Sequence, residues 1–528
     1  MKTFEGKSHY PLNLDQVPLA WRTAFVGDVC QEVQSGFASG EHNAEGSGVP
    51  HLRPMNIDRL GRLDLTQIKS VDPSIDARRL SVGDVLFNNT NSPVLVGKTA
   101  AIRHKADLAF SNHMTRLRPA ADVDAEYLAH HLHYLWMGAY FLHRCSKHVN
   151  QASVSSETLA RTVPIAVAPI REQKRIVEAL DSYLSRLDSA VASLQKVQTK
   201  LKAYRASVLK AAVEGRLVPT EAEIARREGR DYEPASVLLA RILKERRRRW
   251  EEAELTRMKK AGKTPKDDAW KKKYEEPETP DTSKLPSLPE GWCWASLDAL
   301  LAESLRNGHS ARETKDLNGV RTLTLSAVTE ADFGIHNTKP TVADRDKVDD
   351  LWLMAGDILI ERANTPELVG TAAMFRGAPN FAIFPDLLVR VRCTRDVVGD
   401  YIEMVLRAPS SRRYFQTAAQ GIAGSMPKIS QGTIEMLPIP LPPASEQERI
   451  FVDVHRLLSI AESSGISVTR DLGRVHRLRQ SILKWAFEGK LVDQDPNDEP
   501  AEDLLARIRA EREAAPTTKT RGRKAKSS

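Results

Sequence analysis

The chain has few cysteines and no long apolar run. Its four cysteines, Cys30, Cys145, Cys293 and Cys393, are scattered without a CxxC pair, a pattern that fits a reducing compartment better than a disulfide framework or a zinc site. No apolar run reaches the roughly 18 residues that would span a bilayer, and the first residues lack the apolar core of a signal peptide. The sequence therefore predicts a soluble cytoplasmic protein whose cysteines are ordinary buried thiols.

The chain also lacks the motifs of several enzyme classes. It has no Asn-Pro-Pro-Tyr or Asp-Pro-Pro-Tyr of an amino-methyltransferase, no HExxH and no nuclease-like carboxylate cluster. His130, His131 and His133 do not have the four-residue spacing that favours a shared metal on a helix. Gly97-Lys98-Thr99 resembles the end of a phosphate-binding loop, but the glycine required five positions earlier is Ser92. We predict no catalytic residue, no metal site and no cofactor in this chain.

Size and charge set only broad limits. With 528 residues the chain is too long for one hydrophobic core, and about three or four folding units are expected. The 77 Lys and Arg exceed the 69 Asp and Glu, which gives a net charge of +8. That excess permits a nucleic-acid partner without requiring one.

The most informative feature is an internal repeat at about half the chain length. Three pairs of segments match in the same order: 83–97 with 356–370, 163–218 with 437–492, and 233–242 with 499–508. The first pair begins Gly-Asp-Val-Leu-Phe in one copy and Gly-Asp-Ile-Leu-Ile in the other. Between the matching segments the two halves diverge widely. A shared scaffold with differing contents predicts two related modules that bind different things.

Each half contains a long predicted helix. The first, 171–214, has no proline or glycine, follows Pro169 and stops before Gly215. At alternating steps of four and three residues it presents only apolar side chains for about five heptads, which is the pattern of a coiled-coil seam, and its length would be about 65 Å. The second copy keeps this register, although Ser464, Gly465 and Asp471 weaken its middle. The residues predicted at the helix–helix or partner interface are Ile176, Leu180, Tyr183, Leu187, Leu194, Leu201, Ile450, Val454, Leu457, Val475, Leu478 and Ile482.

Two such helices, joined through a whole globular domain, can pair antiparallel and hold two domains apart with approximate two-fold symmetry. The alternative is that each helix packs only on its own domain. Short strands, such as 83–87 and 357–360, and helices, such as 125–141 and 401–407, mix in both halves. The predicted fold is α+β, with two globular mixed α/β domains separated by two long antiparallel helices that form a coiled-coil spacer. The expected boundaries are 1–168 for the first globular domain, 169–218 for the first spacer helix, 219–288 for a charged helical linker, 289–443 for the second globular domain, 444–490 for the second spacer helix and 491–528 for a C-terminal segment with a basic disordered tail.

Polar loops follow several of the predicted strands. Asn can bond adenine through two hydrogen bonds and Arg can do the same with guanine, so such loops suit the reading of base edges. Loops are polar in any protein, and an ordinary solvated turn is the alternative for each residue. The candidate DNA-binding residues are Arg53, Asn56, Asn88, Asn89, Asn91, Asn112, His113, Arg306, Asn307, Arg362, Asn364 and Lys428.

Two strongly charged segments lie outside these loops. The linker from Glu221 to Lys284 carries runs such as 244–249 and 271–273, with acidic residues interspersed. A solvated helix and linker is the first interpretation, and a contact with phosphates is the second. The basic tail at 519–526 could add sequence-independent affinity for DNA.

These motifs resemble one family, the specificity subunits of type I restriction-modification systems. The resemblance is carried by the repeated segments 83–97 and 356–370, by Met426-Pro427-Lys428-Ile429-Ser430, by Glu446-Gln447-Glu448-Arg449-Ile450 at the start of the second long helix, and by the domain start Leu288-Pro289-Glu290-Gly291-Trp292, whose weaker counterpart is Val17-Pro18-Leu19-Ala20-Trp21. It covers nearly the whole chain. The first half matches only loosely at 148–155, so the end of its domain is less well defined.

The resemblance implies that each globular domain is a target-recognition domain that reads one half of a bipartite DNA site in the major groove. It implies that the helices fix an unread spacer and dock two methyltransferase (modification) subunits that carry S-adenosylmethionine. Restriction/translocase subunits that use ATP and Mg would join the complex, and no catalysis would reside in this chain. From the residues alone, two alternatives remain: a stand-alone tandem DNA-binding regulator, and a nuclease or methyltransferase, which the absent motifs disfavour.

Overall fold

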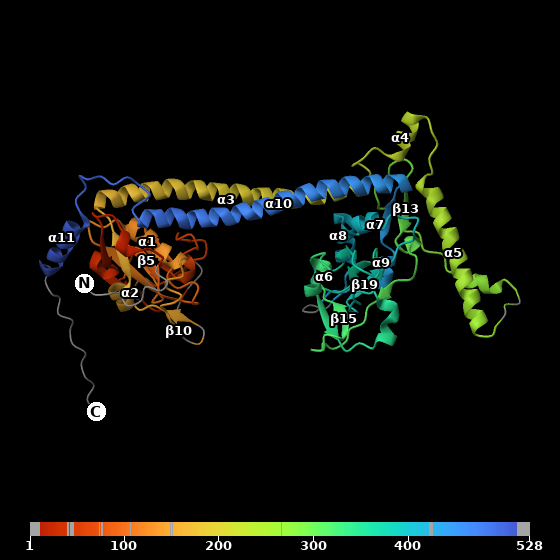
Figure 1. Ribbon diagram of the computed structural model, residues 1–528, viewed down its shortest axis with the longest axis horizontal. Coiled ribbons are helices and arrows are strands. Elements are labelled where there is room, and N and C mark those ends of the chain that lie inside the picture. Colours follow the sequence, from red (N-terminus) through yellow and green to blue (C-terminus); the bar gives the residue numbers. More distant parts are fainter. Residues whose placement is uncertain are drawn as a thin grey trace, which may run out of the picture. The chain divides into compact units, whose positions relative to one another are not determined.

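The computed structural model forms two compact units. It describes residues 11–514 except 40, 41, 43–46, 73, 75–77, 106, 148, 150, 264, 266 and 422–425. Unit 1 consists of Met1–Gln195 with Thr469–Ser528, and unit 2 consists of Lys196–Val468. Each unit holds one globular domain, part of both long helices, and a shorter helix from the segment that follows a long helix (Figure 1). The predicted basic tail lies outside the described residues.

The globular domain of unit 1 is built on an antiparallel sheet in the order β2-β9-β5-β7, with α1 packed against it. Smaller sheets, β4-β3-β8 and β10-β11-β6, flank it, and β1 pairs with β12. The elements are β1 Arg22–Phe25, β2 Cys30–Ser35, β3 Val49–Leu52, β4 Lys69–Val71, β5 Val85–Asn88, β6 Thr90–Asn91, β7 Thr99–Ala101, β8 Ala109–Phe110, β9 Met114–Pro119, β10 Ser146–Lys147, β11 Ala152–Ser153, β12 Pro164–Val167, α1 Ala125–Met137, α2 Ser156–Thr162, α11 Ala501–Ala514, and the 3-10 turns η1 Leu14–Gln16, η2 Val26–Val29 and η3 Pro54–Asn56.

The globular domain of unit 2 repeats this plan with the sheet β14-β19-β17-β18 and the pair β13-β20. Strand β5 pairs Val85 with Leu117, and its counterpart β17 pairs Ile358 with Val391. The elements are β13 Cys293–Ser296, β14 Arg306–Asn307, β15 Val320–Leu323, β16 Thr338–Thr341, β17 Ile358–Glu361, β18 Ala372–Met374, β19 Leu388–Val391, β20 Pro438–Leu441, α4 Glu221–Glu228, α5 Ala235–Lys260, α6 Ser326–Thr329, α7 Gly399–Arg407, α8 Pro409–Ala418, α9 Gln431–Glu435, and the 3-10 turns η4 Ala269–Lys273, η5 Asp298–Leu300, η6 Ile335–Asn337 and η7 Arg345–Leu351. The α+β fold predicted from the sequence is confirmed. The helix expected at 125–141 ends earlier, at Met137.

The repeated Gly-Asp pair starts the central strand of each sheet. The buried Asp84 carboxylate accepts hydrogen bonds from the Ser81 backbone and from Arg118, at 2.8 Å each. In unit 2, Asp357 accepts from the Met354 backbone and from Arg392 in the same way. A buried carboxylate is tolerated only when its acceptor sites are filled. The aspartate of the Gly-Asp pair therefore stabilises the sheet and is not placed to contact DNA.

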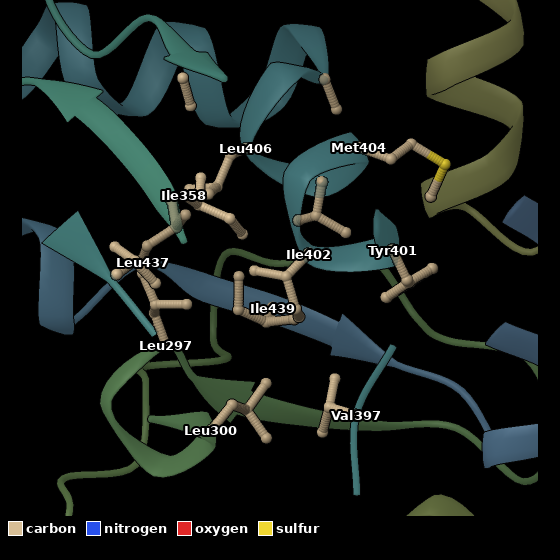
Figure 2. Packing of buried hydrophobic residues seen from close by; sticks show 14 of the residues in the cluster. Leu297, Leu300, Ile358, Val397, Tyr401, Ile402, Met404, Leu406, Leu437 and Ile439 are labelled. Atoms are coloured by element: carbon tan, nitrogen blue, oxygen red, sulfur yellow. The ribbon is translucent and has the colours of Figure 1, made fainter. Parts of the chain in front are cut away.

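The core of the domain in unit 2 lies between the sheet and helix α7. Figure 2 shows Ile358 of β17 meeting Leu406 of α7, while Leu437 and Ile439 approach from the segment of β20. All four side chains are at most 1% exposed. Burial of such side chains contributes roughly 1.5–3 kcal/mol each before entropy is subtracted. This core holds rigid the strands whose ends carry the polar loops.

The two long helices are α3, Ile170–Val213, and α10, Ala444–Phe487, each of 44 residues. Within unit 1 the first turns of α3 pack with the last turns of α10, as Leu180 and Leu184 share a cluster with Ile482. Within unit 2 the last turns of α3 pack with the first turns of α10, as Val208 lies in one cluster with Ile450. The helices therefore pair antiparallel in both units, as predicted. The alternative is partly right too, because α3 also packs on the first domain through Ile176 and Leu180.

The predicted heptad register needs a correction at one of its two positions. The series Leu180, Leu187, Leu194, Leu201 and Val208 is buried or half-buried, but Tyr183 is 45% exposed while its neighbour Leu184 is buried. In α10 the same slip leaves Leu478 45% exposed and buries Arg479, whose guanidinium is paired with Asp188. The first turns of α3 face a globular domain and advance in steps of four, Ile176, Leu180, Leu184, as a 3.6-residue period requires. One of the two positions of the 3.5-residue seam that follows is therefore displaced by one residue, from Tyr183 to Leu184.

Each long helix is joined to its domain by a buried carboxylate. Trp21 Nε1 donates to Glu172 at 2.9 Å, and Trp292 Nε1 donates to Glu446 at 2.9 Å. Both carboxylates are at most 1% exposed, and burial raises the pKa of each. The tryptophan is the residue that opens the domain and the glutamate opens the helix. This contact explains why those two motifs accompany each other in both halves.

The glutamine after each of these glutamates links two backbone segments. Gln173 accepts from the Asp124 backbone at 2.9 Å and donates to the Ala168 carbonyl at 2.7 Å. Gln447 does the same with Val398 and Pro442, at 3.0 Å each. The side-chain amide ties the start of the domain's helix (α1 or α7) to the last strand.

The arginine two residues further on binds the segment that follows the other long helix. Arg175 pairs with Asp498 at 2.7 Å, and Arg449 pairs with Glu221 at 2.6 Å. Asp498 follows α10 and Glu221 follows α3. The Glu-Gln-x-Arg motif is therefore structural in all three of its polar positions.

The helix of the third repeated segment packs on the globular domain of the other half of the repeat. Helix α11, which follows α10, packs Leu504 and Ile508 into the core of the first domain and pairs Arg507 with Asp122. Helix α5, which follows α3, buries Leu238 and Ile242 against the second domain. Each domain is therefore completed by a helix that comes from the other half of the repeat.

Two further predictions can be compared with the structure. No helix among the described residues is long and apolar enough to cross a membrane. All four cysteines are free, but only Cys30 is fully buried, and burial raises the pKa of its thiol to about 12.

The two junction carboxylates predict different outcomes for the same substitution. Glu446 accepts from Trp292 on one oxygen and from the Glu221 backbone, at 2.8 Å, on the other, so Glu446→Gln places an amide NH₂ against a fixed N–H. We expect it to destabilise the chain by about 1–3 kcal/mol in urea unfolding. Glu172→Gln is the matched control and should cost little, because its second partner is the side-chain amide of Gln494, which can turn over. Equal stability of the two variants would contradict this account.

Candidate nucleic-acid interface

In unit 1 three loops meet at one end of the sheet. Asn89 and Thr90 donate their backbone N–H groups to the His113 carbonyl at 3.1 and 3.2 Å. Gly36 and Phe37 lie against the same turn, since Phe37 N donates to the Phe110 carbonyl at 3.2 Å. Strand β11 closes the group by pairing with β6. We call residues 35–37, 89–92, 111–113 and 152–155 edge 1.

In unit 2 the corresponding loops meet in the same way. Arg362 N donates to the Leu387 carbonyl and His309 N to the Phe384 carbonyl, both at 2.9 Å. Ile429 N donates to the Arg362 carbonyl at 2.9 Å, as Val154 N does to Asn89. We call residues 306–312, 361–365, 384–387 and 427–431 edge 2.

One glycine in each edge is required by close backbone approach. A Cβ atom added to Gly36 would lie 2.1 Å from the Phe110 carbonyl oxygen, and one added to Gly308 would lie 2.2 Å from that of Phe384. Neither position can accept a side chain without moving the backbone. The two edges therefore share a rigid main-chain frame.

Several predicted DNA-binding residues are occupied inside the protein. Asn88 is fully buried and donates to the Leu95 carbonyl at 3.0 Å. Asn89 is buried and bonds the Asn112 carbonyl and Thr115. Asn56 is buried and bonds two carbonyls and the Arg53 backbone. These three side chains therefore stabilise the conformation of the loops.

Asn364 is also engaged on both sides of its amide. Its Nδ2 donates to the buried Glu361 carboxylate at 2.5 Å, and its Oδ1 accepts from the Thr365 backbone at 2.8 Å. Bidentate bonding of an adenine needs both groups. Asn364 would have to give up both contacts to read a base in that way.

Exposed or half-buried candidates remain in edge 1. Asn112 is exposed, and Asn91 and His113 are half-buried. Asn91 Oδ1 accepts a hydrogen bond from the Ser92 backbone N–H at 2.8 Å. This bond fixes the orientation of the Asn91 side chain, including its NH₂ group. Arg53 is half-buried and follows Leu52, whose carbonyl accepts from Ser111 N at 2.9 Å, so it lies beside edge 1.

Edge 2 is more basic than edge 1. Arg306, Asn307 and Lys428 are exposed, and Arg362 is half-buried. Arg306 is 3.9 Å from the nearest oxygen of Asp350, a weak contact at that distance. Within the described part of the chain, the side chains of Arg362 and Lys428 have no hydrogen bond or ion pair to another residue. These donors can bind an external acceptor without breaking an internal contact.

Two polar residues of edge 2 were missed by sequence reasoning. Gln431 donates to Asn307 Oδ1 at 3.2 Å and so connects two of its loops. Glu361 is fully buried and accepts from Thr329 Oγ1 at 2.6 Å, and burial raises the pKa of its carboxyl group. The repeat held the signal for Glu361, because it occupies the position of Asn88.

The edges thus combine one backbone with unlike side chains. Arg362 of edge 2 occupies the position of the buried Asn89, and the exposed amide of Asn112 in edge 1 occupies the position of Asp386 in edge 2. A guanidinium prefers guanine, whereas amide groups prefer adenine. Two such edges are chemically equipped to select different base sequences.

The residues that resembled parts of a phosphate loop or a metal site, Lys98, His131 and His133, are buried in the first domain. Lys98 is buried and donates to the Pro54 carbonyl at 3.2 Å, so it does not form a phosphate loop. Burial lowers the pKa of His131 and His133 to about 3. The described residues contain no group of three or more His, Cys, Asp or Glu that could hold a metal ion.

The known proteins to which this chain is similar come from type I restriction systems. No protein-family model matches it. The type I restriction enzyme EcoKI specificity subunit of Escherichia coli K12 is 25% identical over 481 residues, covering 88% of this chain and 89% of that protein. The StySPI specificity subunit of Salmonella potsdam is 25% identical over 532 residues, covering 97% and 100%. A solved chain from a study of assembly and conformational transition of the type I R-M system superposes with a TM-score of 0.61 at 17% identity over 90% of this chain and 99% of that one, which shows a common fold.

The unpartnered guanidinium of Arg362 yields a prediction. Arg362→Ala should weaken binding to the specific DNA by about 1–3 kcal/mol and relax selection at one base pair, measured by titration against duplexes varied at each position. Arg362→Lys should not restore selectivity, because a lysine lacks the bidentate fork. Arg395→Ala is the matched control, an exposed arginine beyond the opposite end of β19. Loss of selectivity in the control, or none in Arg362→Ala, would contradict the assignment.

Proposed function

The chain belongs to the specificity subunits of type I restriction-modification systems, and we propose that it selects the DNA sequence on which such a complex acts. The observation that carries the proposal is the pair of edges, which share a backbone frame and differ in their polar side chains. The similarity to the two specificity subunits over nearly the whole chain supports it. DNA as the substrate also favours a cytoplasmic location.

Each globular domain would act as a target-recognition domain for one half of a bipartite site. Basic surfaces hold phosphates without regard to sequence, and edge 1 and edge 2 supply the contacts to bases. Asn91, Asn112 and His113 are the proposed readers in edge 1. Arg306, Asn307, Arg362 and Lys428 are those in edge 2. Because each half-site adds its own discrimination, full affinity requires both halves to match.

The long helices would set the unread spacer between the half-sites. Each has 44 residues, which corresponds to about 66 Å, and successive major-groove faces of DNA lie about 34 Å apart. A pair of helices on this scale can keep two domains over separate turns of the duplex. The antiparallel packing within each unit supports this role.

The helices also have faces to offer to partner subunits. Unit 1 exposes Tyr183, Leu478 and Trp485, and unit 2 exposes Val452 and Ile466. Exposed large apolar side chains on otherwise polar helices are typical of protein–protein interfaces. We assign these faces to two methyltransferase subunits, to which restriction/translocase subunits add. S-adenosylmethionine, ATP and Mg belong to those partners, and this chain contributes recognition without catalysis. A stand-alone regulator would have no use for such faces.

The domain organisation predicts a modular target. Methylated adenines mapped in DNA from cells that carry the complex should define a single bipartite motif. Exchanging residues 1–165 for those of a relative with another target should change one half of the motif and leave the other half and the spacer intact. The reciprocal exchange of 293–441 should change the second half only. A change in both halves from one exchange, or cleavage or methyl transfer by the purified chain alone, would overturn the proposal.

A further inference from the structure

One segment outside the recognition loops is strongly basic. Residues 244–274, which we call the basic arm, contain thirteen Lys and Arg against six Asp and Glu, a net charge of +7. The whole chain carries +8. The equivalent five residues of α11, 510–514, hold a single basic residue where 244–248 hold four. The basic run at 244–249 therefore has no counterpart in the described part of α11.

The arm is fixed to the second domain at its base. Leu238 and Ile242 of α5 are buried in the domain core, and Arg246 donates to Asp298 at 2.8 Å. The helix then runs on without a break to Lys260, 18 residues past Ile242, a reach of about 27 Å. Figure 1 shows α5 extending away from the strands of unit 2.

The arm folds back on itself through aromatic contacts. Trp250 of α5 stacks on Trp270 of η4 with ring centroids 6.0 Å apart, and Trp250 contacts Tyr274 at 5.4 Å. Trp270 is buried by this packing. The basic residues at 271–273 are thereby held beside α5 rather than left on a free chain.

Arginines and lysines of the arm differ in their partners. All five arginines form ion pairs, for example Arg248 with Glu245 at 2.6 Å and Arg257 with Glu254 at 2.7 Å. These pairs use up the arm's glutamates. Six exposed lysines have no ion-pair partner among the described residues: Lys244, Lys259, Lys260, Lys263, Lys272 and Lys273. The arm thus presents uncompensated positive charge of one chemical type.

We propose that the basic arm binds the phosphate backbone of double-stranded DNA without reading its sequence. Lysine ammonium groups suit this task, because they act as point charges that release counterions from DNA. A protein partner is disfavoured, because the described part of the arm has no exposed large apolar side chain. Arginine is also enriched in interface hot spots, but the arm's exposed arginines are already paired with its own glutamates. The proposal rests on the proposed function only in taking DNA as the ligand.

Neutralising the free lysines tests the proposal. The variant carries Lys→Gln at 259, 260, 263, 272 and 273 in the full chain, assembled with its partner subunits. Its affinity for a duplex that lacks the target should fall roughly tenfold or more, and the slope of log affinity against log salt should fall by about one for each lysine that contacts a phosphate. Affinity for the target duplex should fall by the same factor, and the methylated motif should not change.

Two controls keep the result specific. Lys→Arg at the same five positions should retain the affinity and the salt slope. Arg257→Gln combined with Glu254→Gln removes an ion pair from the arm without changing its net charge, and should bind like the unaltered chain.

The outcomes separate the competing accounts. An unchanged salt slope in the Lys→Gln variant would overturn the proposal, and so would a failure of that variant to bind partner subunits before DNA is added, which would assign the arm to a protein. Absence of any target preference in the unaltered chain would instead contradict the proposed function, because the arm is measured on DNA without the target.

Discussion

The hydrogen bond between a tryptophan that opens each domain and a glutamate that opens each long helix holds the rest of the structure in place. Trp21 with Glu172 and Trp292 with Glu446 join elements that are about 150 residues apart in sequence. The carboxylate is buried in both copies, so its remaining acceptor sites must also be filled. In unit 2 the backbone of Glu221 fills one of them. The junction therefore also captures the segment that follows the other long helix, and this capture positions the docking helix that completes the domain.

A rigid junction has a direct consequence for DNA recognition. Loops can discriminate bases only if their main chain does not shift to accommodate the wrong one. The core around Ile358 and Leu406, the buried Asp84 and Asp357 carboxylates, and the glycines at 36 and 308 all fix the frame of the two edges. In the proposed function, selection is left to side chains such as Arg362 and Asn112, which can vary between halves without disturbing that frame.

The repeat and the periodicity predicted much of the fold. A helix was expected at 171–214 and is present at Ile170–Val213, because Pro169 and Gly215 limit it and no breaker interrupts it. Gly465 and Gly473 did not end the second helix, since tertiary packing outweighs a loss of about 1 kcal/mol per glycine. The seam position was misplaced by one residue because the first turns of α3 pack on a domain rather than on a helix. That partner is invisible to a heptad count.

The candidate site was predictable in kind and only partly in detail. Composition favoured asparagine and arginine loops after strands, and the structure does bring such loops together at two edges. Composition alone could not separate Asn88 and Asn89, which are buried and bonded within the protein, from Asn112, which is exposed. All three are asparagines in polar segments at strand ends, and the sequence around them does not record their burial.

The sequence by itself determined that two copies of one module exist, where their long helices begin and end, and which family they resemble. These properties follow from local spacing and from matched segments. Only the tertiary structure decided which polar side chains are free to bind an external partner, which domain each docking helix completes, and that the arm's arginines are ion-paired while six of its described lysines are not. The physical reason is that burial, hydrogen-bond partners and ion pairs depend on contacts between residues far apart in the chain, and no local pattern records them.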